Sequence, residues 1–198
     1  MGLDFEYFDG QTPLDDEESR GLLIPTIATR GELDEFEQKN IEQAVQWILT
    51  RSFKPETVFT EDFIRTVHKR MFGEVWAWAG EFRKTNKNIG IDKWQIPTQL
   101  KGLLNDAMHW YNNGTYSYDE IAIRFKHRIV SIHCFPNGNG RHSRIMADII
   151  IAKLFKEAGF SWGAGNLVKK SNERTAYLKA VKEADAGNIH PLIVFSRS

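Results

Sequence analysis

The pattern of apolar positions along the chain predicts a mostly helical protein. Between Glu32 and Thr50 the apolar residues fall on one helical stripe, at Leu33, Phe36, Ile41, Ala44, Val45 and Ile48. Later segments repeat this spacing, with apolar residues at Phe63, Ile64, Val67 and Met71, at Leu100, Leu103, Leu104, Ala107, Met108 and Tyr111, and at Ile121, Ala122, Phe125, Ile129 and Ile132. We expect two more helices, from about Gly140 to Gly159 and over residues 177–184, and a last turn after Pro191.

The period changes once along the chain. Ile89, Ile91, Trp94 and Ile96 alternate with polar or small residues around Asp92 and Lys93, a pattern typical of a β-hairpin. An isolated hairpin is only marginally stable by itself, so we expect it to lie on the helices as a flap. The sequence therefore predicts an all-α fold with one β-hairpin flap.

Length and composition fit one domain without a membrane segment. The chain has 198 residues, 41% of them apolar, which is enough for a single core. We interpret residues 1–31 as an arm packed on a domain that spans 32–198. The 26 acidic and 26 basic residues balance, so no general attraction to nucleic acid or anionic membranes is expected. The single cysteine excludes an internal disulfide, and no signal-like or membrane-spanning run occurs, so we expect a cytoplasmic protein.

The candidate chemistry lies between His133 and Arg144, in a loop that joins two predicted helices. The first N–H groups of a helix have no partner within it, and together with the helix dipole they favour an anion. Gly138 and Gly140 allow the backbone to turn its N–H groups inward and let a phosphate approach. Arg141 and Arg144 are three positions apart and share one helical face. The loop with Asn139 at its centre therefore favours binding of a di- or triphosphate.

His133 precedes this loop and is a candidate general base. A neutral imidazole can take the proton of a hydroxyl group, which beside a phosphate site indicates phosphoryl or nucleotidyl transfer. Asn137 carries the one side-chain oxygen in the loop placed to ligate Mg²⁺. We interpret the neighbouring Cys134 as a buried packing residue.

Simpler interpretations remain open for each of these residues alone. The glycines are also typical of an ordinary turn, and a single histidine more often caps a helix or packs in a core. Arg141 and Arg144 could instead pair with Glu120 or Asp148. The loop lacks the lysine of a P-loop and the third glycine of a dinucleotide fold, and the histidines do not have zinc-site spacing.

The run resembles the signature of the Fic/Doc family, which reads His, any residue, Phe, any residue, an acid, Gly-Asn-Gly-Arg, two residues and Arg. The matching residues are His133, Phe135, Gly138, Asn139, Gly140, Arg141 and Arg144. The resemblance extends over roughly Glu32 to Ser198 and includes the lead Trp78 to Arg83 before the flap. The overall pattern looks closest to the short subgroup called mobile mystery protein B.

This resemblance implies a Fic-type helical bundle and a protein AMP transferase that uses ATP and Mg²⁺ on a serine, threonine or tyrosine hydroxyl. It implies that His133 is the base, that Asn139 with the backbone of Gly138 and Gly140 holds the α-phosphate, and that Arg141 and Arg144 hold the β- and γ-phosphates. Tyr177 would border the adenine, and core packing is an equally open interpretation of that residue. The flap would bind the target segment by strand addition through Ile89, Gly90, Ile91 and Trp94.

Two departures from the family pattern leave alternatives open. Asn137 stands where the family has a metal-binding acid, so the protein could be a catalytically weakened nucleotide-binding or regulatory module. Transfer of phosphate, as in Doc-like toxins, is a third interpretation. The inhibitory glutamate of the family has no full match: Glu32 follows Thr29 by three positions, and a helix first-turn acid is its favoured interpretation. Inhibition by a separate, antitoxin-like protein is therefore also expected, while the oligomeric state is not indicated.

Overall fold

The computed structural model describes residues 12–164 and 172–198, and within them the chain is all-α, as predicted. The helices are α1 (Asp16–Ser19), α2 (Arg30–Leu49), α3 (Pro55–Val58), α4 (Glu61–Phe72), α5 (Ile96–Asn113), α6 (Tyr118–Ile132), α7 (Asn139–Ile149), α8 (Asn172–Asp185) and α9 (His190–Arg197). Shorter helical turns are η1 (Lys93–Gln95), η2 (Ile150–Leu154) and η3 (Trp162–Ala164). The predicted last turn after Pro191 is the helix α9.

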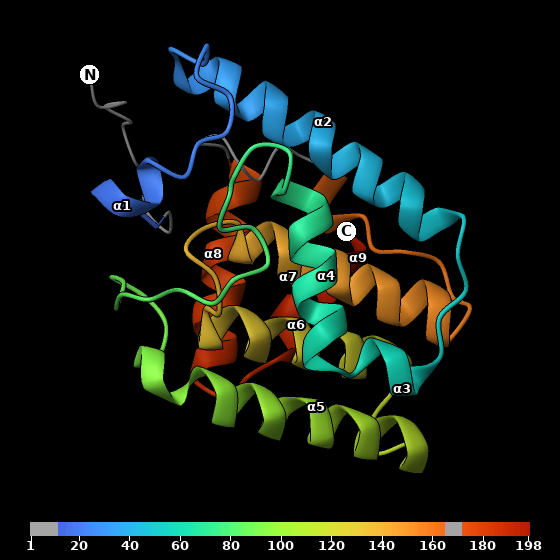
Figure 1. Cartoon of the computed structure of the whole chain (residues 1–198). Coiled ribbons are helices and arrows are strands. Elements are labelled where there is room, and N and C mark those ends of the chain that lie inside the picture. The colour runs from blue at the N-terminus through green and yellow to red at the C-terminus, as the bar shows by residue number, and fades with distance from the viewer. Residues whose placement is uncertain (1–11, 165–171) are drawn as a thin grey trace.

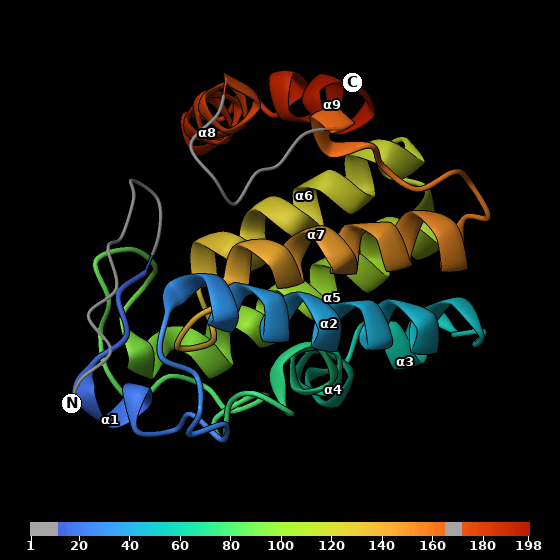
Figure 2. The same cartoon turned by 90° about the horizontal axis from the view of Figure 1, so that it is seen from above.

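The pair α6 and α7 forms the centre of the molecule (Figure 1). Figure 2 shows this pair between α8 and α9 on one side and α2 and α4 on the other, while α5 packs along α6. Both central helices are amphipathic and bury residues that the sequence pattern marks as apolar, including Phe125, Ile129 and Met146. The loop between α6 and α7 is therefore held by two helices that are packed on several sides.

The predicted β-hairpin is wrong, because residues 12–164 and 172–198 contain no strand. Asp92 caps η1 by accepting a hydrogen bond from the N–H of Trp94, and Asn86 accepts one from the N–H of Lys93 at 2.8 Å. Ile96 then begins α5 and is buried, whereas Trp94 is 80% exposed. Side chains thus satisfy backbone groups that a hairpin would pair between strands.

The N-terminal arm runs back over the end of the molecule where α6 meets α7. Its helix α1 begins with a capping box in which Asp15 and Glu18 exchange hydrogen bonds. The arm is fastened to the segment after α4 by an isolated bridge between Leu22 and Trp76 and by a hydrogen bond from Trp78 Nε1 to the carbonyl of Glu18. No helix in the described parts of the chain is both long and apolar enough to cross a membrane.

Candidate active site

The loop between α6 and α7 turns on two residues with positive φ. His133 ends α6 with φ 58° and its N–H still donates to the carbonyl of Ile129. Gly138 precedes α7 with φ 78°, and a Cβ added there would lie 2.5 Å from the ring of Phe72. Only glycine fits both this conformation and this contact. The predicted loop, with a helix N-terminus opening beside His133, is therefore present.

Asn139 holds the loop in shape with its side chain. Its Oδ1 accepts from the N–H of Phe135 at 3.0 Å, and its Nδ2 donates to the carbonyl of Phe135 at 2.8 Å. Phe135 is fully buried and stacks on His68 with ring centroids 3.8 Å apart. Both ends of the Asn139 side-chain amide are thus engaged by the loop itself, so this side chain shapes the loop.

His68 fixes the other side of the loop, and the sequence analysis missed it. Its Nδ1 accepts from the N–H of Gly80 at 3.0 Å, so its Nε2 carries the proton and donates to the carbonyl of Asn137 at 3.0 Å. Burial holds the pKa of His68 well below its ordinary value, so the ring is neutral. The sequence could have indicated that His68 is buried, because it follows Ile64 by four positions and so lies on the same face of α4.

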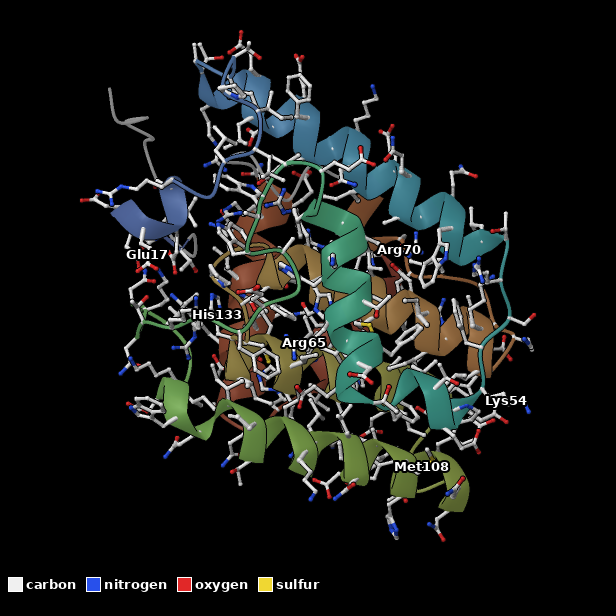
Figure 3. The ribbon with its side chains drawn as sticks, in the orientation of Figure 1. Glu17, Lys54, Arg65, Arg70, Met108 and His133 are labelled. Carbon is white, nitrogen blue, oxygen red and sulfur yellow. The ribbon has the colours of Figure 1, made fainter. Side chains whose placement is uncertain are left out.

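His133 lies among the loops at the end of α6, on the side of the molecule that carries Glu17 and away from Lys54 and Met108 (Figure 3). It is 4% exposed. Burial, assisted by the nearby charge of Arg83, lowers the pKa of His133 to about 4. The imidazole is therefore neutral at physiological pH and available to accept a proton, as a general base requires.

The hydroxyl group of Thr12 lies 2.9 Å from Nε2 of His133. Thr12 belongs to the N-terminal arm and is 6% exposed. Its carbonyl also accepts a hydrogen bond from Nδ2 of Asn137 at 2.8 Å. The arm therefore enters the site and places an alcohol on the candidate base, which no local pattern in the sequence indicates.

Arg83 joins His133 to the segment that covers it. Its Nε donates to the carbonyl of His133 at 2.6 Å, and its Nη atoms donate to the carbonyls of Thr85 and Ile91. Arg83 is 3% exposed. Across this link Gly90, with φ 98°, approaches so closely that an added Cβ would lie 2.5 Å from Cβ of His133. The flap is thus irregular in backbone and yet fixed over the histidine.

The first loop arginine is paired with a carboxylate that the sequence analysis did not consider. Arg141 Nη1 lies 2.6 Å from Glu37 Oε2, and the side chain of Glu37 is 4% exposed. Glu37 also accepts from Nε1 of Trp76 at 2.6 Å. The sequence could have indicated that Glu37 is buried, because it follows Leu33 by four positions and so lies on the same face of α2.

The carboxylates considered as alternative partners are used elsewhere. Glu120 pairs with Arg124 one turn along α6, and Asp148 accepts from the N–H of Phe160 and from Nε1 of Trp162. Within residues 12–164 and 172–198, Arg144 has no carboxylate at ion-pair distance, and its guanidinium lies 5.7 Å from the ring centre of Tyr177. Arg144 therefore brings a positive charge into the site, and among the described residues Asp148 interacts with it only at longer range.

Tyr177 of α8 forms the far wall of the site and is 7% exposed. Burial alone would raise the pKa of Tyr177, but the charges of Lys126 and Arg144 outweigh it and hold the pKa below its ordinary value. Nζ of Lys126, a fully buried lysine, lies 4.6 Å from the ring centre. This wall is electropositive, as binding of a polyanion requires.

These groups surround one cavity of about 610 Å³, a size typical of small-molecule sites. Its wall includes Thr12 from the arm, Ile89, Gly90 and Ile91 from the flap, His133, Tyr177 and the loop residues Asn137, Gly138, Asn139, Gly140, Arg141 and Arg144. Trp94, which was expected at the flap, is not part of this wall. Cys134 is fully buried and burial raises its pKa to about 12, in agreement with its interpretation as a packing residue.

Asn137 does not offer a free ligand for a metal ion. Its Oδ1 accepts from the N–H of Gly138 at 2.6 Å, and its Nδ2 is taken by Thr12. In the part of the chain that the structure describes, no group of three His, Cys, Asp or Glu side chains is arranged to hold a metal. The described side chains therefore offer no cluster that could hold a metal ion by protein ligands alone.

Glu32 acts as a capping residue in α2. Its carboxylate accepts from the N–H groups of Ala28 and Thr29, and these hydrogen bonds lower its pKa. The side chain of Thr29 accepts from the N–H of Glu32 in return. These contacts support the interpretation of Glu32 as a first-turn acid, and they leave an inhibitory role without a described contact to either loop arginine.

Comparison with known proteins points to one family. Residues 58–151 match the model of the Fic/DOC family. The protein adenylyltransferase Fic of Drosophila grimshawi is 25% identical over 185 residues, which are 90% of this chain and 36% of that protein. The corresponding protein of Nematostella vectensis is 24% identical over 187 residues, 89% of this chain and 41% of the relative. The chain thus spans well under half the length of these relatives.

Solved structures share the fold. Fic-1 of C. elegans superimposes with a TM-score of 0.67 at 20% identity, covering 90% of this chain and 51% of that one. BepC of Bartonella tribocorum, with bound AMPPNP, gives a TM-score of 0.66 at 18% identity, covering 92% and 97%. The mobile mystery protein B subgroup stays a prediction. On the family match and the shared fold together, the chain carries a Fic domain, with residues 58–151 matching the Fic/DOC family model.

Proposed function

We propose that this chain is a protein adenylyltransferase, which transfers AMP from ATP to a serine, threonine or tyrosine hydroxyl of a target protein. The observation that carries the proposal is the neutral, buried His133, whose Nε2 holds an alcohol at 2.9 Å beside the open N-terminus of α7. Relatives that are named protein adenylyltransferase align with about nine-tenths of this chain and support it.

In the proposed reaction, the acceptor hydroxyl gives its proton to Nε2 of His133 while its oxygen attacks the α-phosphorus of ATP. The bond from the α-phosphorus to the oxygen that bridges to the β-phosphate breaks, and pyrophosphate leaves with the electron pair. Backbone N–H groups at Asn139 and Gly140 would hold the α-phosphate, since helix N-termini bind phosphate. The N–H of Gly138 would join them once it releases Oδ1 of Asn137. Arg144 and Arg141 would hold the β- and γ-phosphates, with the charge of Arg141 shared by Glu37.

The remaining walls of the cavity would bind the adenosine and the target. We place the adenine against Tyr177, whose ring faces Arg144. Ile89, Gly90 and Ile91 would contact the target segment from the flap. Because the carbonyl of Ile91 is already bonded to Arg83, this contact would not be the regular strand addition that a hairpin edge allows.

Mg²⁺ would accompany ATP on its phosphates and keep most of its waters, as it does where few protein oxygens are offered. When bound, it would neutralise charge on the pyrophosphate that leaves. Asn137 would contribute at most one uncharged oxygen, and only if that oxygen releases the N–H of Gly138.

The amide at Asn137 favours one second candidate, a nucleotide-binding module with weakened catalysis. An uncharged oxygen that is already hydrogen-bonded would add little to the affinity for a metal ion. A separate inhibitory protein, as in toxin–antitoxin pairs, and a cytoplasmic location both stay predictions from the sequence.

The proposal is tested by supplying ATP labelled on either the α- or the γ-phosphate, with Mg²⁺ and lysate proteins as acceptors. Protein-bound label from the α-phosphate alone, lost in His133→Ala and kept in His109→Ala at an exposed position of α5, is the expected result. Label from the γ-phosphate alone would indicate phosphotransfer. Bound nucleotide without any transfer would favour the second candidate.

A further inference from the structure

We infer that Thr12, in the N-terminal arm, is itself an acceptor of the AMP group, so that the chain modifies its own arm within one molecule. The inference rests on the proposed function. Thr12 and His133 are 121 positions apart in sequence, yet the Thr12 hydroxyl lies 2.9 Å from Nε2 of His133. That is hydrogen-bond distance to the base, the position a target hydroxyl must reach.

The arm is seated in the site by more than this one contact. The carbonyl of Thr12 accepts from Asn137, in the catalytic loop, at 2.8 Å, and the next carbonyl, that of Pro13, lies 3.5 Å from Nζ of Lys87. These bonds hold the backbone that directly follows the Thr12 side chain. A loosely held arm would place its hydroxyl only part of the time, whereas this arm is fixed from the loop and from the flap.

Residues after Pro13 extend the contact to Thr85 and Lys87, which lie in the segment that leads into the flap. The hydroxyl of Thr85 donates to Asp15 at 3.0 Å, and Lys87 forms ion pairs with Asp15 and Glu18. The side chains of Lys87 and Glu18 are 6% and 10% exposed, so this pair is largely shielded from water, whereas Asp15 is 36% exposed. The arm thus lies against the segment that leads into the flap, and its Thr12 lines the cavity where a target segment would be expected to bind.

The cavity leaves room for the second reactant. Thr12 forms part of its wall together with Gly138, Asn139 and Gly140, which face the proposed α-phosphate position. In the tautomer with the proton on Nδ1, Nε2 of His133 accepts the Thr12 hydroxyl hydrogen. Oγ1 of Thr12 would then bond to the α-phosphorus, its proton would pass to Nε2, and the bond to the bridging oxygen would break to release pyrophosphate.

One consequence separates self-modification from modification between molecules. Because the acceptor and the base belong to one folded chain, the reaction is first order and its rate constant does not depend on protein concentration. The adenylyl group then stays on the arm at the cavity, so each chain reacts at this position once.

The experiment incubates the full chain with ATP and Mg²⁺ and follows the reaction by intact-mass measurement and peptide mapping, across a dilution series. Thr12→Val removes the hydroxyl at similar volume, Thr12→Ser restores it, and Thr26→Val alters an exposed position of the same arm as the control. The expected result is one adenylyl group per chain, on Thr12, at a concentration-independent rate. It should be lost in Thr12→Val and His133→Ala and kept in Thr12→Ser and Thr26→Val.

Three results would overturn the inference. Transfer to lysate proteins without label on Thr12 would leave the proposed function standing and remove only the self-modification site. Label on Thr12 that forms faster as the protein is concentrated would show that one molecule modifies another. Absence of transfer to any acceptor, from the same protein that binds ATP, would remove both proposals together.

Discussion

Nε of Arg83 donates a 2.6 Å hydrogen bond to the carbonyl oxygen of His133. The same guanidinium donates to the carbonyl of Ile91 in the flap, so one buried side chain sets the distance between the base and its cover. An arginine is needed for this, because its planar guanidinium group donates to several carbonyls from separate nitrogen atoms, whereas a lysine donates from a single nitrogen atom. We therefore predict that Arg83 is a positioning residue that acts through His133.

Arg83→Lys is expected to lower kcat for AMP transfer by roughly 10- to 100-fold, since a small displacement of a catalytic group has effects of this size. Affinity for ATP should change little, because Arg83 is not part of the cavity wall. Transfer rates and nucleotide titrations on the same variant test this split. The matched control is Arg128→Lys, an arginine that pairs with Asp106 at the surface of the protein. An equal loss of ATP affinity in Arg83→Lys would contradict the positioning role.

The two loop arginines are expected to behave differently when each is replaced by alanine. Arg144→Ala removes a charge that no described carboxylate neutralises, so ATP should bind roughly 10- to 100-fold more weakly. Arg141→Ala leaves the buried carboxylate of Glu37 without its ion-pair partner and should lower the free energy of unfolding by about 3 kcal/mol. Calorimetric titration with ATP and urea unfolding on both variants measure the two effects. Equal losses of affinity with unchanged stability would contradict this division.

Stability is expected to fall as the pH drops from about 6.5 to about 4. The pKa values of His133 and His142 are lowered by burial to about 4, and that of His68 lies well below its ordinary value. In this range the unfolded chain binds protons that the folded chain does not, so each histidine lowers stability by up to about 1.4 kcal/mol per pH unit of acidification. Urea unfolding across this range measures the slope.

The same shift predicts that AMP transfer has no acid limb near pH 6.5, because His133 stays neutral while the fold persists. Rates at pH 5.5 and 7.5 under saturating ATP should therefore agree within about twofold. His109→Gln, at an exposed position of α5, serves as the control and should show the same rates as the unaltered chain at both pH values. A titration of the rate centred near 6.5 would show that the catalytic histidine is not buried in its working state.

Asn137→Asp is expected to raise AMP transfer, by two routes that the Mg²⁺ dependence can separate. The carboxylate supplies the charged oxygen that Mg²⁺ prefers, and it can no longer donate to the carbonyl of Thr12. A lower half-saturating Mg²⁺ concentration would identify the metal route. A higher rate on lysate proteins at unchanged Mg²⁺ dependence would identify release of the arm. An unchanged rate would contradict the interpretation that Asn137 weakens the site.

The helices and the loop could be predicted from the sequence because their signals are local. A stripe such as Phe63, Ile64, Val67 and Met71 repeats within one helix, and all four residues are buried in the structure. Thr29 caps α2 through its side chain, which is a local contact of the same kind. The hairpin prediction was wrong because a pattern of four alternating residues is too short to outweigh specific side-chain contacts. Asn86, Asp92 and Arg83 form hydrogen bonds with backbone groups that a second strand would have paired.

The arrangement of the site depends on contacts between distant parts of the chain, which periodicity does not record. Thr12 meets His133 across 121 positions, and Glu37 meets Arg141 across 104. Glu37 is a charged residue within the apolar face of α2. Its position indicates that it has a buried partner but does not identify that partner. The position of the arm left no such sign, because an irregular polar segment can lie on any surface that satisfies its backbone groups.

The most direct test of AMP transfer by His133 is a count of its two products in one reaction. Pyrophosphate and protein-bound AMP are measured together after incubation of the chain with ATP, Mg²⁺ and lysate proteins. Equal amounts of both, and neither in His133→Ala, are expected if an activated hydroxyl displaces pyrophosphate from the α-phosphorus. Pyrophosphate without protein-bound AMP, or equal product formation by His133→Ala, would contradict the assignment of this histidine as the base for transfer to protein.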